Sequence, residues 1–465
     1  MVTTYTGFAI GAINTLFLYT NFLTEEYFGL VMFILASAVI LQPLLSFGVQ
    51  DTIIKFYSSY RNQKEKKDFL TVMLILPLLI IIPVAIVLNI AEKEVMEILS
   101  KKNELIRSYA WLIFIIGIAM AYFEVFYSWC RAHLKSIFGN FMKEVFMRTV
   151  VFVLLFAVYL DILSIEMFMS ALAVMYTVRM LIMMWYAYYL QLPGLNFGIP
   201  DNFNEVLKYC CFIVVAGSVV VMLLEVDKSM IGMLLPGLDN VAFYGVAVFI
   251  AMVISVPARA MNQIASVLTA TFINDNNMKE LSKLYQKSSL NLFIVGGLLF
   301  LLIVLNINEL YKMLDPDYSK GLVVVILISI AKLMDNLMAN NNAILYNSSY
   351  YRIVLGLGVL LAILTVVFNL ILIPMFGIEG AAIATLISLT IYNGIKLYIV
   401  WRAFKMHPFQ NNMFITLSLL LGFSGVFYYW DFPFHPLLNI ILKSILIVSG
   451  YLTPVSYTHL TLPTN

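Results

Sequence analysis

Residues 370–388 read LILIPMFGIEGAAIATLIS, a stretch in which a proline, two glycines and several small residues separate two strongly apolar runs. Pro374 predicts the end of the first run as a helix, because proline lacks the N–H that helical hydrogen bonding needs. Gly377 then permits a tight turn. Small residues follow at intervals of four from Gly380 to Ser388, on one face of a second helix. In lipid, such a face lets helices approach closely, so a packed helical hairpin is expected if the chain lies in a membrane.

The composition places the whole chain in a membrane. Its 465 residues are 62% hydrophobic and only 12% charged, and the mean hydropathy is +0.93. A soluble chain carries roughly twice this share of charged residues. No segment has the polarity of a soluble domain, and the net charge of +2 gives no reason to expect nucleic-acid binding.

Cysteine and histidine give no sign of enzymatic chemistry. Cys130, Cys210 and Cys211 lie in or beside apolar runs without paired spacing, and we interpret them as buried packing residues. The four histidines lack the spacing of a metal site or a catalytic triad. The sequence therefore predicts a protein that is not an enzyme and has neither a metal site nor a cofactor.

The apolar runs predict an all-α integral membrane protein, because each approaches the roughly 20 residues that cross a bilayer. We expect fourteen spans, near 4–20, 29–47, 69–90, 108–129, 149–161, 166–190, 209–227, 241–257, 289–306, 321–340, 353–373, 379–395, 412–430 and 437–453. Most lysines and arginines outside the spans follow even-numbered helices. By the positive-inside rule, both termini are expected to face the cytoplasm.

Two similar loops predict an internal repeat. The segments that begin at Pro43 and Pro257, about 215 residues apart, each continue as an amphipathic helix and end in a basic cluster. Six helices separate the two loops, so the repeats share one orientation and imply a central cavity between two halves. The alternative is that any two basic cytoplasmic loops look alike. The expected organisation is a six-helix N-terminal half (1–208), a six-helix C-terminal half (209–408) and two extra helices (409–453).

The end of the chain differs in character. Its last residues read PVSYTHLTLPTN, a polar stretch without a basic residue. We interpret 456–465 as a non-native tail.

Polar residues inside spans are candidates for a substrate path, because a charge at mid-bilayer needs a cavity or a partner. The clearest set is a stripe at steps of three and four along the tenth span. It consists of Lys332, Asp335, Asn336 and Asn340. We expect it to line a hydrated lumen in which Lys332 attracts an anion; the alternative is a structural Lys332–Asp335 pair between helices.

Further candidates lie elsewhere in the chain. Arg179 in the sixth span is the matching cation of the first half, unless it snorkels or pairs with Glu124 of the fourth span. Three charges at one end of the seventh span either line the lumen or neutralise one another: Glu225, Asp227 and Lys228. Arg259 either contacts substrate or anchors the helix by the positive-inside rule, and Asn14 is a weaker lumen candidate.

Several motifs resemble one transporter family. They are NSSYYR (347–352) followed by IPMFGIEGAAIATLIS (373–388), FLTEEYFGLV (22–31) and EVDKSMIGMLLPGLDNVAFYGVA (225–247). They are similar to motifs of Wzx-type polysaccharide flippases, which belong to the multidrug/oligosaccharidyl-lipid/polysaccharide (MOP) exporter superfamily. The likeness covers nearly the whole chain.

The resemblance implies a flippase of the bacterial cytoplasmic membrane. Such a protein moves polyprenyl-diphosphate-linked oligosaccharide from the cytoplasmic to the periplasmic leaflet by alternating access, among membrane lipids and with a polysaccharide polymerase and glycosyltransferases as partners. Glu124, Asp335 and Glu225 are candidates for coupling transport to protons. A lipid II flippase and a cation-coupled multidrug antiporter are the alternatives within the superfamily. A membrane glycosyltransferase or polymerase is the alternative outside it.

Overall fold

The described backbone folds into helices joined by short connections. The computed structural model describes residues 2–194, 198 and 202–459, without the side chains of 2, 4, 215–224, 263, 351 and 454–459, and no strand occurs among them. Most of the predicted non-native tail, 460–465, lies outside the described residues. Two compact units divide the chain, Met1–Ala242 and Phe243–Asn465.

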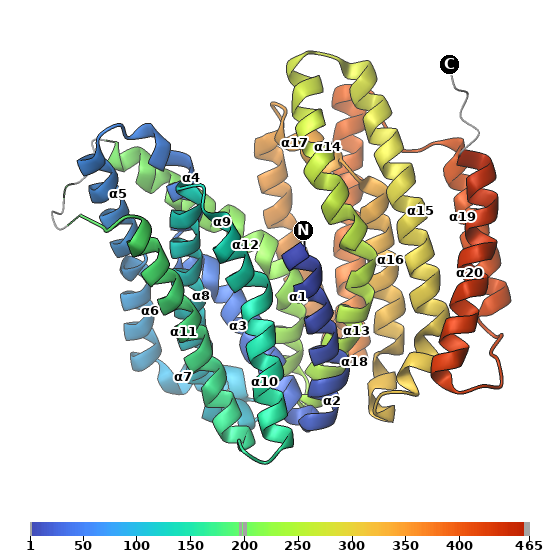
Figure 1. Ribbon diagram of the computed structural model, residues 1–465, viewed down its shortest axis with the longest axis horizontal. Coiled ribbons are helices and arrows are strands. Elements are labelled where there is room, and N and C mark those ends of the chain that lie inside the picture. The colour runs from blue at the N-terminus through green and yellow to red at the C-terminus, as the bar shows by residue number, and fades with distance from the viewer. Residues whose placement is uncertain (1, 195–197, 199–201, 460–465) are drawn as a thin grey trace. The chain divides into compact units, whose positions relative to one another are not determined.

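The first unit contains the helices coloured blue to green in Figure 1. They are α1 (Val2–Ile13), η1 (Asn14–Leu18), α2 (Tyr19–Phe22), α3 (Glu25–Leu45), α4 (Val49–Phe56), η2 (Tyr57–Ser59), α5 (Gln63–Ile75), α6 (Leu78–Ile90), α7 (Glu92–Ser100), α8 (Leu105–Ala132), α9 (Ser136–Phe141), η3 (Met142–Phe146), α10 (Met147–Tyr159), α11 (Ile165–Leu190), α12 (Phe203–Leu234) and the start of α13 (Asp239–Met252).

Helix α8 is central to the first unit, where it packs against α3, α4 and α11. Its aromatic side chains Phe123 and Trp129 are almost fully buried in the core. Helix α3 also packs against α12. At Gly29 of α3 a Cβ would lie 1.7 Å from the carbonyl oxygen of Leu238, so only glycine allows this approach of the two backbones.

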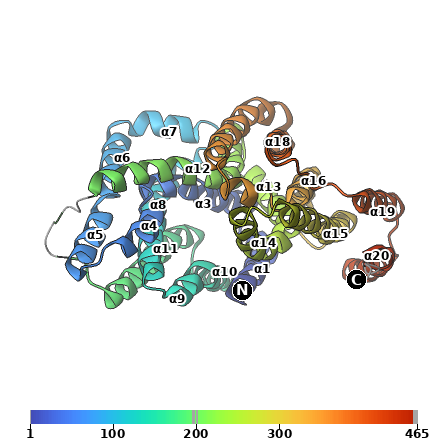
Figure 2. The same cartoon turned by 90° about the horizontal axis from the view of Figure 1, so that it is seen from above.

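The second unit contains the rest of α13, then η4 (Val253–Ser255), α14 (Val256–Asn274), α15 (Met278–Tyr311), η5 (Pro316–Gly321), α16 (Leu322–Met338), α17 (Asn341–Tyr346), α18 (Tyr351–Phe404), α19 (Asn411–Phe427) and α20 (Pro436–His459). Its centre is α15, which contacts α14, α16, α19 and α20, while α18 packs against α16 and α17. Figure 2 shows α15, α16 and α18 end-on.

Helix α18 contains the predicted hairpin, with one correction. Helical backbone continues through Pro374 and breaks at Gly377, where φ is 62° and ψ is −139°. The prediction that the helix ends at Pro374 was wrong because proline removes one hydrogen bond without forcing a turn, whereas Gly377 adopts a conformation open essentially to glycine alone. The small face is buried: a Cβ at Gly380 would lie 2.0 Å from the Leu372 carbonyl oxygen, and Ser388 is fully buried.

All fourteen predicted stretches are helical over most of their length. By length and composition, nine helical stretches of the described residues qualify as membrane spans, and one of these, Arg352–Phe404, contains two predicted spans. The chain is therefore a multi-pass membrane protein, and the count of fourteen crossings stays a prediction.

The loops behind the predicted repeat are helical as expected. After α3 the chain turns at Phe47 and Gly48, both with positive φ, and continues as the amphipathic α4. After η4 it continues as α14. The repeat itself, its division near residue 208 and the orientation of the termini stay predictions.

Candidate functional site

Charged side chains inside the first unit gather around Glu124 of α8. Its carboxylate forms an ion pair of 2.7 Å with Lys143 of η3. The Lys143 ammonium and the Arg131 guanidinium lie 5.8 and 4.8 Å from the centre of the Tyr127 ring. We call these four residues and Asp51 of α4 the Glu124 cluster.

Asp51 belongs to this cluster through its electrostatics. Burial raises the pKa of its carboxyl, and the positive charge of Arg131 opposes this shift. The repulsion from Glu124 adds to the rise in pKa. Asp51 lies outside the predicted spans, so sequence reasoning did not single it out. The turn at Gly48 that brings α4 back against α8 is what places it there.

Arg179 of α11 lies beside the cluster in an aromatic setting. Its side chain is buried, with the guanidinium 4.1 Å from the centre of the Phe123 ring and 4.9 Å from that of Tyr176. Among the described residues, Glu124 forms its ion pair with Lys143 and none with Arg179. The guanidinium thus makes cation–π contacts with Phe123 and Tyr176, while its buried Nε has no hydrogen-bond partner among the described residues. Its role toward a substrate stays a proposal.

Asn14 lies in the π-helical segment η1. It is buried and donates a hydrogen bond from Nδ2 to the carbonyl oxygen of Arg148, at 2.7 Å. This bond ties η1 to α10.

In the second unit the predicted stripe divides into two parts. The side chain of Lys332 is half-buried and that of Asp335 is exposed. Within the described part of the chain neither forms an ion pair. Asn336 is buried and donates a hydrogen bond to the carbonyl oxygen of Ile254, at 2.9 Å. Asn340 follows the end of α16 at Met338 and donates to Thr269 of α14. The stripe is therefore not one continuous helical face.

A second polar cluster includes a buried lysine that sequence reasoning assigned to a loop. Lys396 is 1% exposed, and its ammonium donates a hydrogen bond to Asn342 Oδ1 at 3.0 Å and lies 4.1 Å from the centre of the Tyr392 ring. Asn393, one turn earlier, donates to Asp335 at 3.4 Å. We call these five residues the Lys396 cluster.

Helix α18 continues past the predicted end of the twelfth span at residue 395 and ends at Phe404. The signal that could have found Lys396 is its helical spacing from Asn393 and Val400, which continues one face of α18 past the apolar run.

The remaining candidates have separate surroundings. Glu225 and Lys228 of α12 form an ion pair with each other, which matches the self-neutralising alternative. Asp227, which lies between them in the sequence, is buried. Arg259 is exposed on α14.

Cations outnumber carboxylates at these positions. The Glu124 cluster and Arg179 provide three cations against two carboxylates, and the α16 and α18 positions provide Lys332 and Lys396 against Asp335. Phenol rings contact the cations of both sets, and amides contact Asp335 and Lys396 in the second. Such an arrangement favours an anionic group that also carries many hydroxyls, because amides both donate and accept hydrogen bonds.

A family model described as "Polysaccharide biosynthesis protein" matches residues 1–268, more than half of the chain. The chain belongs to the polysaccharide biosynthesis protein family. The match confirms the resemblance to Wzx-type flippases drawn from the sequence motifs. No curated protein matches this family member in sequence.

Solved structures show the fold of this family member. The structure titled "Lipid II flippase MurJ, inward closed conformation" is 12% identical, matches 98% of each chain and has a TM-score of 0.77. An inward-facing multidrug resistance MATE family transporter of the MOP superfamily is 14% identical over 91% of this chain and 96% of that chain, with a TM-score of 0.65. A MOP superfamily transporter from Pyrococcus furiosus is 14% identical over 87% and 94%, with a TM-score of 0.57. The fold is that of MOP transporters.

Proposed function

We propose that this protein is a flippase for polyprenyl-diphosphate-linked oligosaccharides in the bacterial cytoplasmic membrane, with both termini in the cytoplasm. It moves the head group to the periplasmic leaflet by alternating access, without covalent chemistry, and supplies a polysaccharide polymerase with units that glycosyltransferases build. The observation that carries the proposal is the presence of cations inside the spans of a polysaccharide biosynthesis family member.

The physical argument concerns the diphosphate. It brings two or more negative charges through a low-dielectric region, and unpaired charges there are costly. Lys332 is a cation without an ion pair among the described residues, so it is free to attract the diphosphate. The amides of the Lys396 cluster and the Arg179 and Asn14 side chains are proposed to bind hydroxyls as the sugar passes. Asp227, Lys228 and Arg259 are proposed as contacts nearer the ends of the path.

The test is the leaflet location of the lipid-linked oligosaccharide in a deletion strain. Without the gene, we expect units to accumulate on the cytoplasmic side, and the wild-type gene should relieve this accumulation. If the units never accumulate and surface polysaccharide is unchanged, the proposal is wrong. Lipid II accumulation would instead favour the alternative suggested by the likeness to MurJ, and drug sensitivity alone would favour the antiporter alternative suggested by the likeness to the MATE transporter.

Proton coupling is a further part of the proposal. Glu124 and Glu225 already form ion pairs with lysines, so Asp335, which has none within the described residues, is the most available of the three candidates. We expect the flipping rate in vesicles to change with external pH and to lose that dependence in Asp335→Asn. A rate that is independent of pH in the wild type would contradict this coupling.

Lys396→Met is expected to give a stable protein with impaired transport. Lys396 forms no ion pair among the described residues, so methionine leaves no carboxylate unpaired. Loss of the cation should lower flipping about fivefold or more. The matched control is Lys443→Met, since Lys443 is also 1% exposed but pairs with Asp431 outside the cluster. Equal loss of transport in both variants would argue against a specific role of Lys396. Thermal unfolding in detergent reports their stability.

A further inference from the structure

Helix α7 is expected at the membrane surface, because it is too short and too charged to cross the bilayer. It connects the span Gln63–Ile90 to the span Leu105–Ala132, so it cannot itself lie far within the bilayer. Figure 2 shows it lying across the direction of these spans. Its sequence, EKEVMEILS, combines three glutamates and one lysine with a set of apolar residues. Such a helix rests in the interface with its apolar side toward the bilayer or the bundle.

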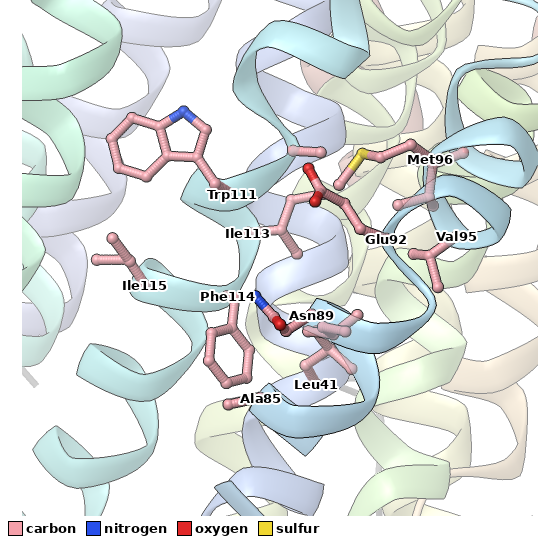
Figure 3. Close-up of a pocket in the computed structure, with 13 residues that line it drawn as sticks. Leu41, Ala85, Asn89, Glu92, Val95, Met96, Trp111, Ile113, Phe114 and Ile115 are labelled. Carbon is pink, nitrogen blue, oxygen red and sulfur yellow. The ribbon is translucent and has the colours of Figure 1, made fainter. Parts of the chain in front are cut away.

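Beneath α7 is a cavity of about 420 Å³ between α3, α6, α7 and α8. This volume falls within the range of small-molecule binding sites. The lining is almost wholly apolar: Leu41, Ala85, Leu88, Val95, Met96, Leu99, Ala110, Trp111, Ile113, Phe114 and Ile115, together with Asn89 and Glu92. Figure 3 shows the Glu92 carboxylate of α7 and the Asn89 amide of α6 pointing toward the α8 residues Ile113 and Phe114.

The cavity borders lipid-facing surface. On α6 the side chains of Ile86, Val87 and Ile90 are 53%, 58% and 78% exposed. On α8, Trp111 is 49% exposed, and tryptophan is typical of the membrane interface. An acyl chain can therefore enter from the bilayer without leaving apolar surroundings.

Glu92 sets the chemistry at the rim of the cavity. It forms no ion pair within the described part of the chain, and Asn89 is the other polar residue of the lining. A carboxylate at the edge of an apolar cavity favours a ligand with an apolar chain and a cationic end. Water alone would find few polar partners in such a lining.

We propose that this cavity binds one acyl chain of a phospholipid whose head group carries a primary amine, and that Glu92 pairs with the ammonium. The lipid holds α7 against α6 and α8. This inference does not rest on the proposed flippase function, because the cavity lies within the first unit and includes none of the cations proposed to bind the diphosphate.

The test is native mass spectrometry of the full chain in detergent with equal amounts of palmitoyl-oleoyl phosphatidylethanolamine and phosphatidylglycerol. The wild type should retain one phosphatidylethanolamine, and Ala85→Phe, which fills the cavity, should lose it. Glu92→Gln should lower the preference for phosphatidylethanolamine about two- to fivefold, as expected for loss of a partly exposed ion pair. Glu94→Gln removes the same charge from the same turn of α7 outside the lining, so it should keep the preference.

Three results would overturn the inference. The first is retention of the lipid by Ala85→Phe, and the second is an equal change of preference in Glu92→Gln and Glu94→Gln. The third is displacement of phosphatidylethanolamine by polyprenyl phosphate, which would make the cavity a site for the polyprenyl chain. If Ala85→Phe fails to fold, phosphatidylethanolamine with a photoreactive diazirine in its acyl chain decides the question in the wild type. Labelling of peptides from α6, α7 and α8 supports the inference, and labelling elsewhere alone contradicts it.

Discussion

Gly29→Ala is expected to leave little folded protein. The new methyl group would lie 1.7 Å from the Leu238 carbonyl oxygen, a backbone atom that no side-chain rotation can move away. Helix α3 would have to separate from the segment between α12 and α13, and the loss of packing should cost more than about 3 kcal/mol of unfolding free energy. Size-exclusion chromatography and thermal unfolding of the protein in detergent measure this loss.

Gly356→Ala is the matched control for this variant. Gly356 is also helical, but a Cβ there would meet nothing within 4 Å. Alanine should therefore be neutral or slightly stabilising, by up to about 1 kcal/mol. Similar stability of the two variants would show that the close contact at Gly29 does not hold the helices together.

Lys332→Ala is expected to slow flipping of a polyprenyl-diphosphate-linked sugar about tenfold or more while the protein remains folded. A charged hydrogen bond to the diphosphate contributes about 1.5–3 kcal/mol, and 1.4 kcal/mol corresponds to a factor of ten in rate. Lys332 has no ion pair among the described residues, so its removal strands no carboxylate partner. Initial flipping rates in proteoliposomes measure the effect.

Two variants separate charge from structure at this position. Lys332→Arg keeps the cation and should retain most of the rate. Lys320→Ala removes a lysine that pairs with Asp317 at the surface and should leave the rate unchanged. If Lys332→Ala flips as fast as Lys320→Ala, the role of Lys332 is structural and the proposed anion contact is wrong.

The sequence was sufficient for the membrane fold because the apolar runs that lipid requires are long and continuous. It predicted the hairpin of α18 through the glycine at 377 and the small face from Gly380 to Ser388, both of which the structure contains. It predicted a helix end at Pro374, because proline lacks an N–H, whereas the helix continues to Gly377. That detail depends on backbone geometry, which hydropathy does not report.

The charged clusters were only partly predictable. Glu124 and Asp335 were recognised because they interrupt apolar runs, but their surroundings include Lys143 and Lys396, which lie outside the predicted spans. Helix α18 continues beyond its apolar stretch and buries Lys396, so a boundary drawn by hydropathy assigns this lysine to a loop. Amphipathic α7 was missed for a related reason, because its nine residues are too short and too charged to count as a span.

The most direct test of the central claim uses the purified chain alone in proteoliposomes. A synthetic polyprenyl-diphosphate-linked disaccharide is placed in both leaflets, and a membrane-impermeant sugar oxidase reports the fraction that it can reach from outside. The flippase account predicts that the protein allows all of the substrate to be oxidised, while protein-free vesicles retain an inaccessible inner pool. An inner pool that stays protected in the presence of the folded protein, at every pH and ion gradient applied, would contradict the account.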